Sequence, residues 1–351
     1  MDVVQGMLTE LAGNPGFYAG LALEHLAISG LAILIAIVVG GLAGILIAGF
    51  RRAAKPTLAV MNLLYTIPSI SMLGFLIPFS GVGDVTAVIA LTVYALLPMV
   101  RSTHTGLTGV DPAIVEAARG MGSTRLQVLL KVRLPLAAPV IMAGIRNMAT
   151  MSIALAGIAS FVGAGGLGVA IYRGITTNNA AMTMAGSLVI AALALVVDAL
   201  LGVVERRMRL RTAKARRQNR VAAGVVAVAC AVAAVAAGVS ALLAPGSAGT
   251  VRIASKPMTE QYVITEMLRE LIEDRTDLSV ELTQGVGGGT SNIMPAMESG
   301  EFDLYPEYTS TGWNLVLGEE GVYSEDLFGE LAVAYEDELG MAWRGMYGFS
   351  D

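Results

Sequence analysis

The chain has 351 residues, of which 55% are hydrophobic and only 15% are charged, and its mean hydropathy is +0.67. These values exclude an ordinary soluble globular protein, in which about a quarter of the residues are charged. The charges are also unevenly divided, with a net of +10 over residues 1–244 and a net of −15 over residues 245–351. This division indicates an apolar, basic membrane domain followed by an acidic soluble domain.

Six segments are apolar and long enough to cross a bilayer, which requires about 20 helical residues. They are predicted at residues 27–50, 57–80, 84–103, 134–161, 180–204 and 221–244. The pattern predicts an all-α polytopic membrane domain over residues 1–220 and an additional transmembrane helix at 221–244. The single cysteine, Cys230, lies in the last segment and cannot form an intrachain disulfide.

The loops between these segments differ in their content of Lys and Arg. The first, third and fifth loops are basic, whereas the second has no Lys or Arg and the fourth has only Arg173. Because basic loops stay on the cytoplasmic side, we expect the N-terminus and the acidic C-terminal domain outside the cell and the loop 111–135 inside. The basic run 206–220 contains no aromatic residue and is better explained as a membrane-proximal linker than as a nucleic-acid site.

Arg146 and Asp198 fall well inside predicted spans, away from their ends. Intramembrane charges are costly unless they are paired or line a polar path. A proton relay would need a chain of titratable groups, and these spans contain few. We therefore expect Arg146 and Asp198 either to pair between helices or to line a translocation path. The two histidines, His25 and His104, are isolated in sequence and predict no metal site.

The cytoplasmic loop contains a short predicted helix. Asp111 can cap its first turn, and Pro112 suits the first helical position, where the missing N–H costs nothing. Glu116-Ala117-Ala118 follows, then Gly122, and the segment closes with Leu134-Pro135. An amphipathic interfacial helix would account for the first part of this pattern, but not for the spacing out to Leu134-Pro135.

This spacing resembles the EAA loop of bacterial ABC importer permeases, and the similarity extends over most of residues 25–205. The resemblance implies that Glu116, Ala117, Ala118 and Gly122 form a coupling helix that docks on a separate ATPase subunit. It also implies a homodimer, since each permease half supplies one loop to one ATPase. The chain has no Walker motif, so ATP and Mg²⁺ are expected on the partner ATPase, and the chain itself is not an enzyme.

The C-terminal domain reads as alternating strands and helices. A short linker at 245–250 is rich in Gly, Pro and Ser. Beyond it, over residues 251–351, strands are predicted at 251–254, 278–282 and 302–305. Helices are predicted at 259–274, with apolar residues from Val263 to Leu271 at helical spacing, and at 291–298. This order predicts a parallel three-layer α/β lobe, with ligand-binding groups in the loops that follow the strands.

Two of those loops carry recognisable motifs. Ala254-Ser-Lys-Pro-Met-Thr-Glu-Gln261 and Tyr305-Pro-Glu-Tyr-Thr-Ser-Thr-Gly312 resemble segments of glycine betaine, choline and carnitine binding proteins. Ergothioneine importers are similar in architecture. The resemblance implies an osmoprotectant-type importer of the bacterial plasma membrane, with its substrate-binding domain fused to the permease.

The chemistry of such ligands suggests a role for each motif residue. A quaternary ammonium has no N–H to donate and is held by aromatic faces. Tyr308 is therefore expected as an aromatic wall, although a tyrosine at a strand end is also often a core residue. Lys256, Gln261 and Thr311 are expected as polar contacts, and Tyr305 as a further wall or a packing residue.

Binding proteins of this type have two lobes, whereas only about 100 residues follow the linker. The sequence thus predicts a partial lobe that binds ligand weakly or not at all by itself. A membrane-anchored ligand sensor remains an alternative function. An ion-driven transporter would require inverted repeats and paired intramembrane ions, which the sequence does not offer.

Overall fold

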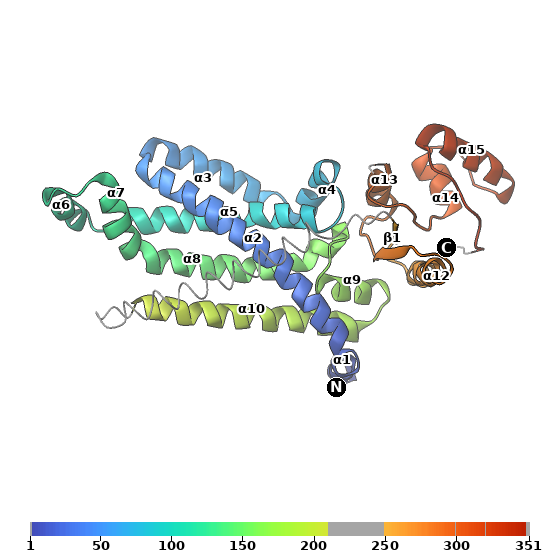
Figure 1. Ribbon diagram of the computed structural model, residues 1–351, viewed down its shortest axis with the longest axis horizontal. Coiled ribbons are helices and arrows are strands. Elements are labelled where there is room, and N and C mark those ends of the chain that lie inside the picture. Colours follow the sequence, from blue (N-terminus) through green and yellow to red (C-terminus); the bar gives the residue numbers. More distant parts are fainter. Residues whose placement is uncertain (1, 210–248, 299, 320, 349–351) are drawn as a thin grey trace. The chain divides into compact units, whose positions relative to one another are not determined.

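The computed structural model describes the chain except for residue 1, residues 210–248, residues 299 and 320, and residues 349–351 (Figure 1). The chain divides into two compact units. The first is helical and includes residues 1–76, 83–160 and the described residues from 164 to Arg209. The second contains the short segments 77–82 and 161–163 together with the described C-terminal region from residue 249.

The helical unit consists of long apolar helices joined by short turns (Figure 1). Its elements are α1 (Asp2–Gly13), α2 (Pro15–Gly49), α3 (Arg51–Thr66), α4 (Ser69–Ser80), α5 (Asp84–Thr108), α6 (Pro112–Gly120), α7 (Arg125–Val128), the π-helical η1 (Leu129–Arg133), α8 (Leu134–Leu155), the 3₁₀ segment η2 (Ala156–Val162), α9 (Gly168–Thr176) and α10 (Ala180–Arg209). At 1.5 Å per residue, α2 is about 50 Å long, which exceeds the thickness of a hydrocarbon core.

Among the described residues, four helices are long and apolar enough to span a membrane, and a bent pair would make a fifth. The pair is α3 and α4, which meet at 97°. The break follows from Pro68, because the residue before a proline is disfavoured in the helical region, and Ile67 is extended with φ −65° and ψ 129°. These helices correspond to the first five predicted spans. The sixth, at 221–244, lies outside the described residues.

Close packing between α2 and α5 depends on glycines. A Cβ atom built on Gly44 would lie 2.6 Å from the Cβ of Thr103, and one built on Gly40 would lie 3.0 Å from that of Met99. The distance at Gly44 is incompatible with a larger residue in the present backbone, and the one at Gly40 would require Met99 to shift. The small residues of α2 therefore allow the two helices to approach closely, as is common in membrane helix pairs.

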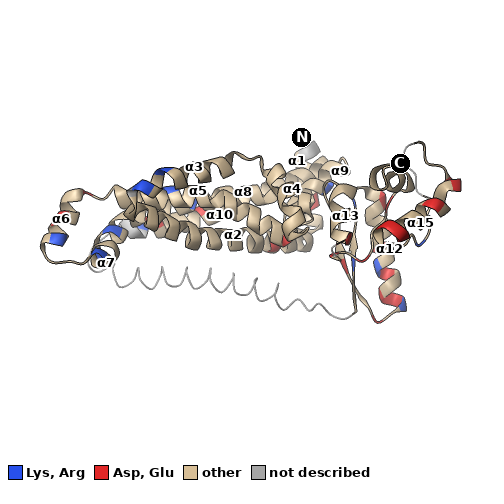
Figure 2. Ribbon diagram, turned by 90° about the horizontal axis from the view of Figure 1, so that it is seen from above, with Lys and Arg blue, Asp and Glu red and all other residues tan. Residues whose placement is uncertain are grey.

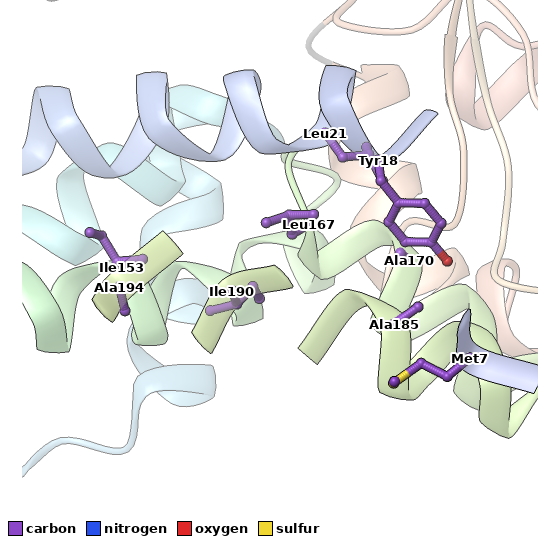
Figure 3. Packing of buried hydrophobic residues seen from close by; sticks show 9 residues of the cluster. All are labelled: Met7, Tyr18, Leu21, Ile153, Leu167, Ala170, Ala185, Ile190 and Ala194. Atoms are coloured by element: carbon purple, nitrogen blue, oxygen red, sulfur yellow. The ribbon is translucent and has the colours of Figure 1, made fainter. Parts of the chain in front are cut away.

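Two helices of this unit were not predicted from the sequence. Both α1 and α9 contribute to a buried apolar cluster that also includes parts of α2, α8 and α10 (Figure 3). Its buried members are Met7, Tyr18, Leu21, Ile153, Leu167, Ala170, Ala185, Ile190 and Ala194. The amphipathic α1 and α9 are thus stabilised by tertiary packing, which short-range sequence patterns do not reveal.

The second unit is an α/β lobe built on two parallel strands, β1 (Thr250–Ala254) and β2 (Ser279–Thr283), which pair in register from Thr250↔Ser279 to Ala254↔Thr283. Its helical elements are α12 (Thr259–Arg275), α13 (Thr290–Glu298), α14 (Thr309–Thr311), η3 (Gly312–Val316), η4 (Glu325–Leu327) and α15 (Phe328–Leu339). The crossover from β1 through α12 to parallel β2 confirms the predicted alternation.

The predicted third strand is reduced to one parallel bridge, Ile253↔Leu304. The Asp303 carboxylate accepts the backbone N–H of Arg252 at 2.8 Å, which occupies a donor that a strand ladder would use. Pro306 follows closely and has no N–H to extend the pairing. The prediction of a strand over 302–305 is therefore wrong in extent, since only Leu304 pairs with β1.

The apolar residues of α12 are divided between two environments. Ile264 is buried, whereas Val263, Met267 and Leu271 are exposed. The buried face is instead completed by the polar Gln261 and Thr265. Acidic residues are frequent on α12 and α15 (Figure 2), whereas α7 and η1 carry Arg125, Lys131 and Arg133, in line with the charge division seen in the sequence.

Candidate functional site

The first candidate site is the segment around α6. The Asp111 carboxylate accepts the backbone N–H of Ala113 at 2.9 Å, and Pro112 occupies the first turn, as predicted. Gly122 ends the helix with φ +84°, and the N–H of Ser123 donates to the carbonyl of Ala118 at 3.1 Å. This is the Schellman arrangement, which requires a left-handed residue and explains the glycine.

The four predicted docking residues differ in exposure. Glu116, Ala117 and Gly122 are exposed, whereas Ala118 is buried with Val115 and Val128. Ala118 therefore holds α6 against the following segment, and the other three are accessible. The sequence analysis did not single out Ile114 and Met121, whose apolar side chains are exposed on and just after α6. An exposed methionine at a helix end is the signal that could have indicated them.

The segment after α6 leads directly into a membrane helix. Thr124 and Gln127 form a reciprocal capping box at the start of α7. The helix widens into η1, where the Leu134 N–H donates to the Leu129 carbonyl. Pro135 has no N–H to donate, which favours this wider turn. Leu134-Pro135 thus marks the root of α8.

The glycine-rich turn at 163–168 is not a phosphate site. The backbone N–H of Gly165 donates to Asp84 at 3.1 Å and that of Gly166 donates to Glu24 at 3.0 Å. Two carboxylates already occupy the donors that a phosphate would need, and their charge would repel it. The turn is therefore structural.

The predicted interhelical pair between Arg146 and Asp198 is confirmed. The Arg146 guanidinium donates to both oxygens of Asp198, at 3.0 and 2.7 Å, and to Glu205 at 2.6 Å. The sequence analysis missed Glu205, since it adjoins the basic run at 206–220. Its spacing of two helical turns from Asp198 was the available signal.

The second candidate site lies in the lobe, at the ends of the parallel strands. The loop after β1 is fixed by Gln261, whose side-chain oxygen accepts the Lys256 N–H at 2.9 Å. Ser255 accepts the N–H of Gly285 at 3.0 Å through its hydroxyl. Gln261 is fully buried, so its role in this structure is to shape the loop that carries Lys256.

Glu307 is the centre of this site, although the sequence analysis did not single it out. Its carboxylate accepts the hydroxyls of Thr290 at 2.7 Å and Tyr305 at 3.0 Å and the backbone N–H of Tyr308 at 2.6 Å. It also forms an ion pair with Lys256, and each of the two side chains is only 4% exposed. A buried carboxylate requires such partners, and its place within the recognised motif was the available signal.

Tyr308 contacts a cation through its ring face. The Lys256 ammonium lies 4.8 Å from the ring centroid, within the range of a cation–π interaction. The Tyr308 hydroxyl donates to Glu260 and lies 3.1 Å from the Met258 sulfur. The aromatic face is thus held in place by the segment that joins β1 to the first turn of α12.

A cavity of about 700 Å³ opens beside these residues within the lobe. Its walls include the predicted Gln261, Tyr305 and Tyr308, and also Glu307, but neither Lys256 nor Thr311. Thr311 lies in α14 and is half-buried. Further lining comes from α15 and the segment after it, in particular from Tyr335, Trp343, Arg344 and Tyr347. These residues were missed because only the tertiary fold brings them to the strand ends.

The aromatic walls are neutral hydrogen-bond donors. Burial, together with the nearby Glu307 carboxylate, raises the pKa of Tyr305 and of Tyr335 well above the ordinary value. The Tyr335 hydroxyl is buried and has no hydrogen-bond partner among the described residues. Trp343 packs edge-on against Tyr335 at 5.3 Å and against Phe328 at 6.1 Å. Within the described part of the chain, no group of three or more His, Cys, Asp or Glu side chains could hold a metal.

Each of the two units matches a known protein family. Residues 28–210 match the family described as binding-protein-dependent transport system inner membrane component. Residues 249–351 match the substrate binding domain of ABC-type glycine betaine transport systems. The helical unit also resembles an inward-facing methionine ABC transporter, with a TM-score of 0.52 and 24% identity, over 54% of this chain and 95% of that chain. This likeness shows the fold alone.

Several curated relatives are similar in sequence. The ergothioneine transport permease/ergothioneine binding protein EgtU of Helicobacter pylori is 35% identical over 93% of this chain. The chain spans 59% of the length of that relative. The choline transport system permease OpuBD of Bacillus subtilis is 42% identical over 55% of this chain and 86% of its own length.

The glycine betaine/carnitine/choline transport system permease OpuCD of the same organism is 40% identical over 55% of this chain and 85% of its own length. The family match covers more than half of the chain, and these permeases are covered almost completely. The chain therefore belongs to the inner membrane components of binding-protein-dependent ABC transport systems, and it carries a fused substrate-binding region of the glycine betaine type.

Proposed function

We propose that the chain is the permease of an ATP-driven importer for quaternary-ammonium compounds such as glycine betaine, choline and carnitine, with a fused extracytoplasmic binding lobe. The observation that carries the proposal is the cation already seated on an aromatic face, the Lys256 ammonium over Tyr308. The names of the relatives OpuBD and OpuCD point to the same substrate class.

The cavity has the chemistry that such ligands need. Its walls offer several aromatic side chains, Tyr305, Tyr308, Tyr335 and Trp343, which attract a quaternary ammonium through their faces. Glu307 also lines the cavity, and its charge is balanced by the ion pair with Lys256. Arg344, which also lines it, would bind the carboxylate of a betaine or carnitine.

We assign the predicted ligand-binding residues distinct roles. Tyr308 and Tyr305 contact the ligand directly, because both line the cavity. Gln261 and Lys256 act chiefly by fixing the loop and the Tyr308 face. Thr311 lies one helical turn beyond Tyr308 and would contribute a hydroxyl when the ligand is bound.

The α6 segment would supply the contact with the energy source. The exposed Glu116, Ala117 and Gly122, with Met121 beside them, fit the groove of a separate ATPase, and Ala118 supports them from behind. ATP and Mg²⁺ would be bound by that ATPase. Two copies of the permease would present two such segments. We further propose that the N-terminus and the lobe face outward from a bacterial plasma membrane and that 221–244 is one more span.

Ergothioneine is the alternative substrate. It is a betaine with an aromatic ring, and the H. pylori relative with ergothioneine in its name matches this chain through both the permease and the binding region. The aromatic cavity suits either class. A ligand sensor without transport would need the cavity but not the α6 segment.

The proposed ligand site is tested by tryptophan fluorescence of the full chain. Trp313 and Trp343 are the only tryptophans, and Trp343 lines the cavity whereas Trp313 does not. The Trp313→Phe variant would be titrated with glycine betaine, choline, carnitine and ergothioneine. Because the partial lobe is expected to bind only weakly, we expect at least one of them to change Trp343 emission at high ligand concentration, with a smaller initial slope in a second variant that adds Tyr308→Ala. No response to any of the four, or equal slopes in both variants, would contradict the site.

A further inference from the structure

Arg146 joins two membrane helices at a single point. From α8 its guanidinium reaches two carboxylates on α10, Asp198 through two nitrogens and Glu205 through the third. The two carboxylates are seven residues apart, about two turns, so they lie on one face of α10. The three hydrogen bonds use all three nitrogens of the guanidinium, each donating to a different carboxylate oxygen, and so engage the whole planar fork of the arginine.

The helix backbone between the carboxylates is shaped to receive the guanidinium. Gly202 lies between Asp198 and Glu205, and a Cβ atom built on it would be 3.2 Å from the Arg146 Cζ. A side chain at this position would crowd the guanidinium. The absence of a side chain at Gly202 therefore leaves room for the Arg146 guanidinium between the two carboxylates. We call Arg146, Asp198, Gly202 and Glu205 the α8–α10 clamp.

The same helix α8 is continuous with the segment proposed to dock on the ATPase. Val115 and Ala118 of α6 are buried against Val128, and Val132 of η1 packs on this cluster. From η1 the chain enters α8 without a break. A movement of α6 would therefore also move the N-terminal end of α8. The clamp lies about three helical turns further along α8.

The residue types of the clamp suggest more than stability. Apolar side chains of similar volume often stabilise as well as a buried ion pair, and an intramembrane charge is costly. A guanidinium instead forms hydrogen bonds in fixed directions. These bonds are difficult to break within a bilayer, because breaking them would leave unpaired charges there.

We infer that Arg146 is a positioning residue for transport: with Asp198 and Glu205 it fastens α10 to α8, so that ATPase-driven movement of α6 and α8 also moves α10. The inference rests on the proposed function, since it presumes an ATPase acting on α6. Loss of the clamp should leave ATP hydrolysis in place and uncouple it from import.

The test uses proteoliposomes that contain the chain and its partner ATPase. Phosphate release and the uptake of radiolabelled glycine betaine, choline, carnitine or ergothioneine would be measured in the same preparation. In Arg146→Gln we expect about a tenfold fall in uptake per ATP hydrolysed. Gly202→Ala should reduce the same ratio without altering any charge. Gly30→Ala is the matched control, because a Cβ atom there meets nothing within 4 Å. An unchanged ratio in both clamp variants, with normal wild-type transport, would overturn the inference.

A second measurement keeps the inference separate from the choice of substrate. Spin labels would be placed on exposed Val140 of α8 and Leu195 of α10, after replacing the single Cys230 with serine. The distance between the labels would be measured without nucleotide and with ATP, Mg²⁺ and vanadate. It should be the same in both states when Arg146 is present and should differ between them in Arg146→Gln. A changing distance when Arg146 is present, or a constant one in the variant, would overturn the clamp even if all four compounds fail to be imported. A chain that recruits no ATPase would instead contradict the proposed function itself.

Discussion

Glu307 is the buried charge that organises the binding lobe. Removing one partner of a buried ion pair leaves the other charge unpaired, at a typical cost of about 3 kcal/mol. We therefore expect Glu307→Gln to reduce the free energy of unfolding of the lobe by about that amount, because Lys256 would remain buried without its carboxylate. Both tryptophans belong to the lobe, so their fluorescence during urea unfolding reports on this unit.

The control for this prediction is Arg269→Gln. Arg269 pairs with Glu266 at 2.8 Å, but both side chains are exposed, and such surface pairs contribute less than about 1 kcal/mol. In the double variant Glu307→Gln/Lys256→Met we expect part of the lost stability to return. Equal effects of Glu307→Gln and Arg269→Gln would show that the buried pair is not important for the lobe.

The buried tyrosines predict how the lobe responds to alkaline pH. The pKa of Tyr305 is raised by burial and then by Glu307, so the folded lobe retains the proton that the unfolded chain releases near pH 10. Protonated Tyr305 therefore contributes its full share of the free energy of unfolding below about pH 10, and this contribution falls as the pH rises further. Urea unfolding between pH 8 and pH 11, a range set by the ordinary tyrosine pKa of about 10, should show this decline.

Tyr305→Phe should flatten the alkaline decline, because phenylalanine has no proton to lose. The control is Tyr347→Phe, since Tyr347 is exposed to solvent and is expected to leave the pH profile unchanged. A decline of the same steepness in the wild type and in Tyr305→Phe would show that other groups cause it.

At the scale of helices, the contact between α2 and α5 depends on Gly44. Because a Cβ atom there would lie 2.6 Å from that of Thr103, Gly44→Ala should cost about 1–3 kcal/mol through overpacking. The loss would be measured as a lower midpoint of thermal aggregation of the detergent-solubilised chain. Gly30→Ala, in the same helix but with open space around it, should leave the midpoint unchanged. A similar midpoint for both variants would refute the close contact.

The elements also show what the sequence could predict. Apolar length predicted four helices that are long and apolar enough to span a membrane, together with the bent pair α3 and α4, whose bend follows from Pro68. Local patterns could not predict α1 or α9, because their apolar residues are stabilised only by the cluster around Ile153 and Leu167. The strand at 302–305 was overestimated, since Asp303 competes for the backbone N–H of Arg252.

The candidate sites were predictable to different degrees. Asp111, Pro112 and Gly122 act through local backbone chemistry, so their roles could be read from the sequence. The Arg146–Asp198 pair could be expected because few intramembrane charges were available. Glu307 could have been singled out from its place in the motif Tyr305–Gly312. Tyr335 could not, because only the tertiary fold brings α15 to the cavity.

At the scale of the whole molecule, the chain joins a permease of the ABC importer family to a substrate-binding region in one polypeptide. The linker and the residues before it, 210–248, lie outside the described part of the structure. The two units are therefore described separately. One is a helical unit with an exposed α6, and the other is a lobe with an aromatic cavity. The account requires that ligand capture by the lobe and ATP use at α6 serve one transport cycle.

The most direct test is ATP-dependent uptake in proteoliposomes containing the full chain and its partner ATPase. Radiolabelled glycine betaine, choline, carnitine and ergothioneine would be offered with ATP or with a non-hydrolysable analogue. The account predicts accumulation of at least one of the four with ATP only, and its loss in Glu116→Lys, which reverses the charge on the exposed face of α6. Accumulation that is independent of ATP, or none of any compound by a complex that hydrolyses ATP, would contradict it.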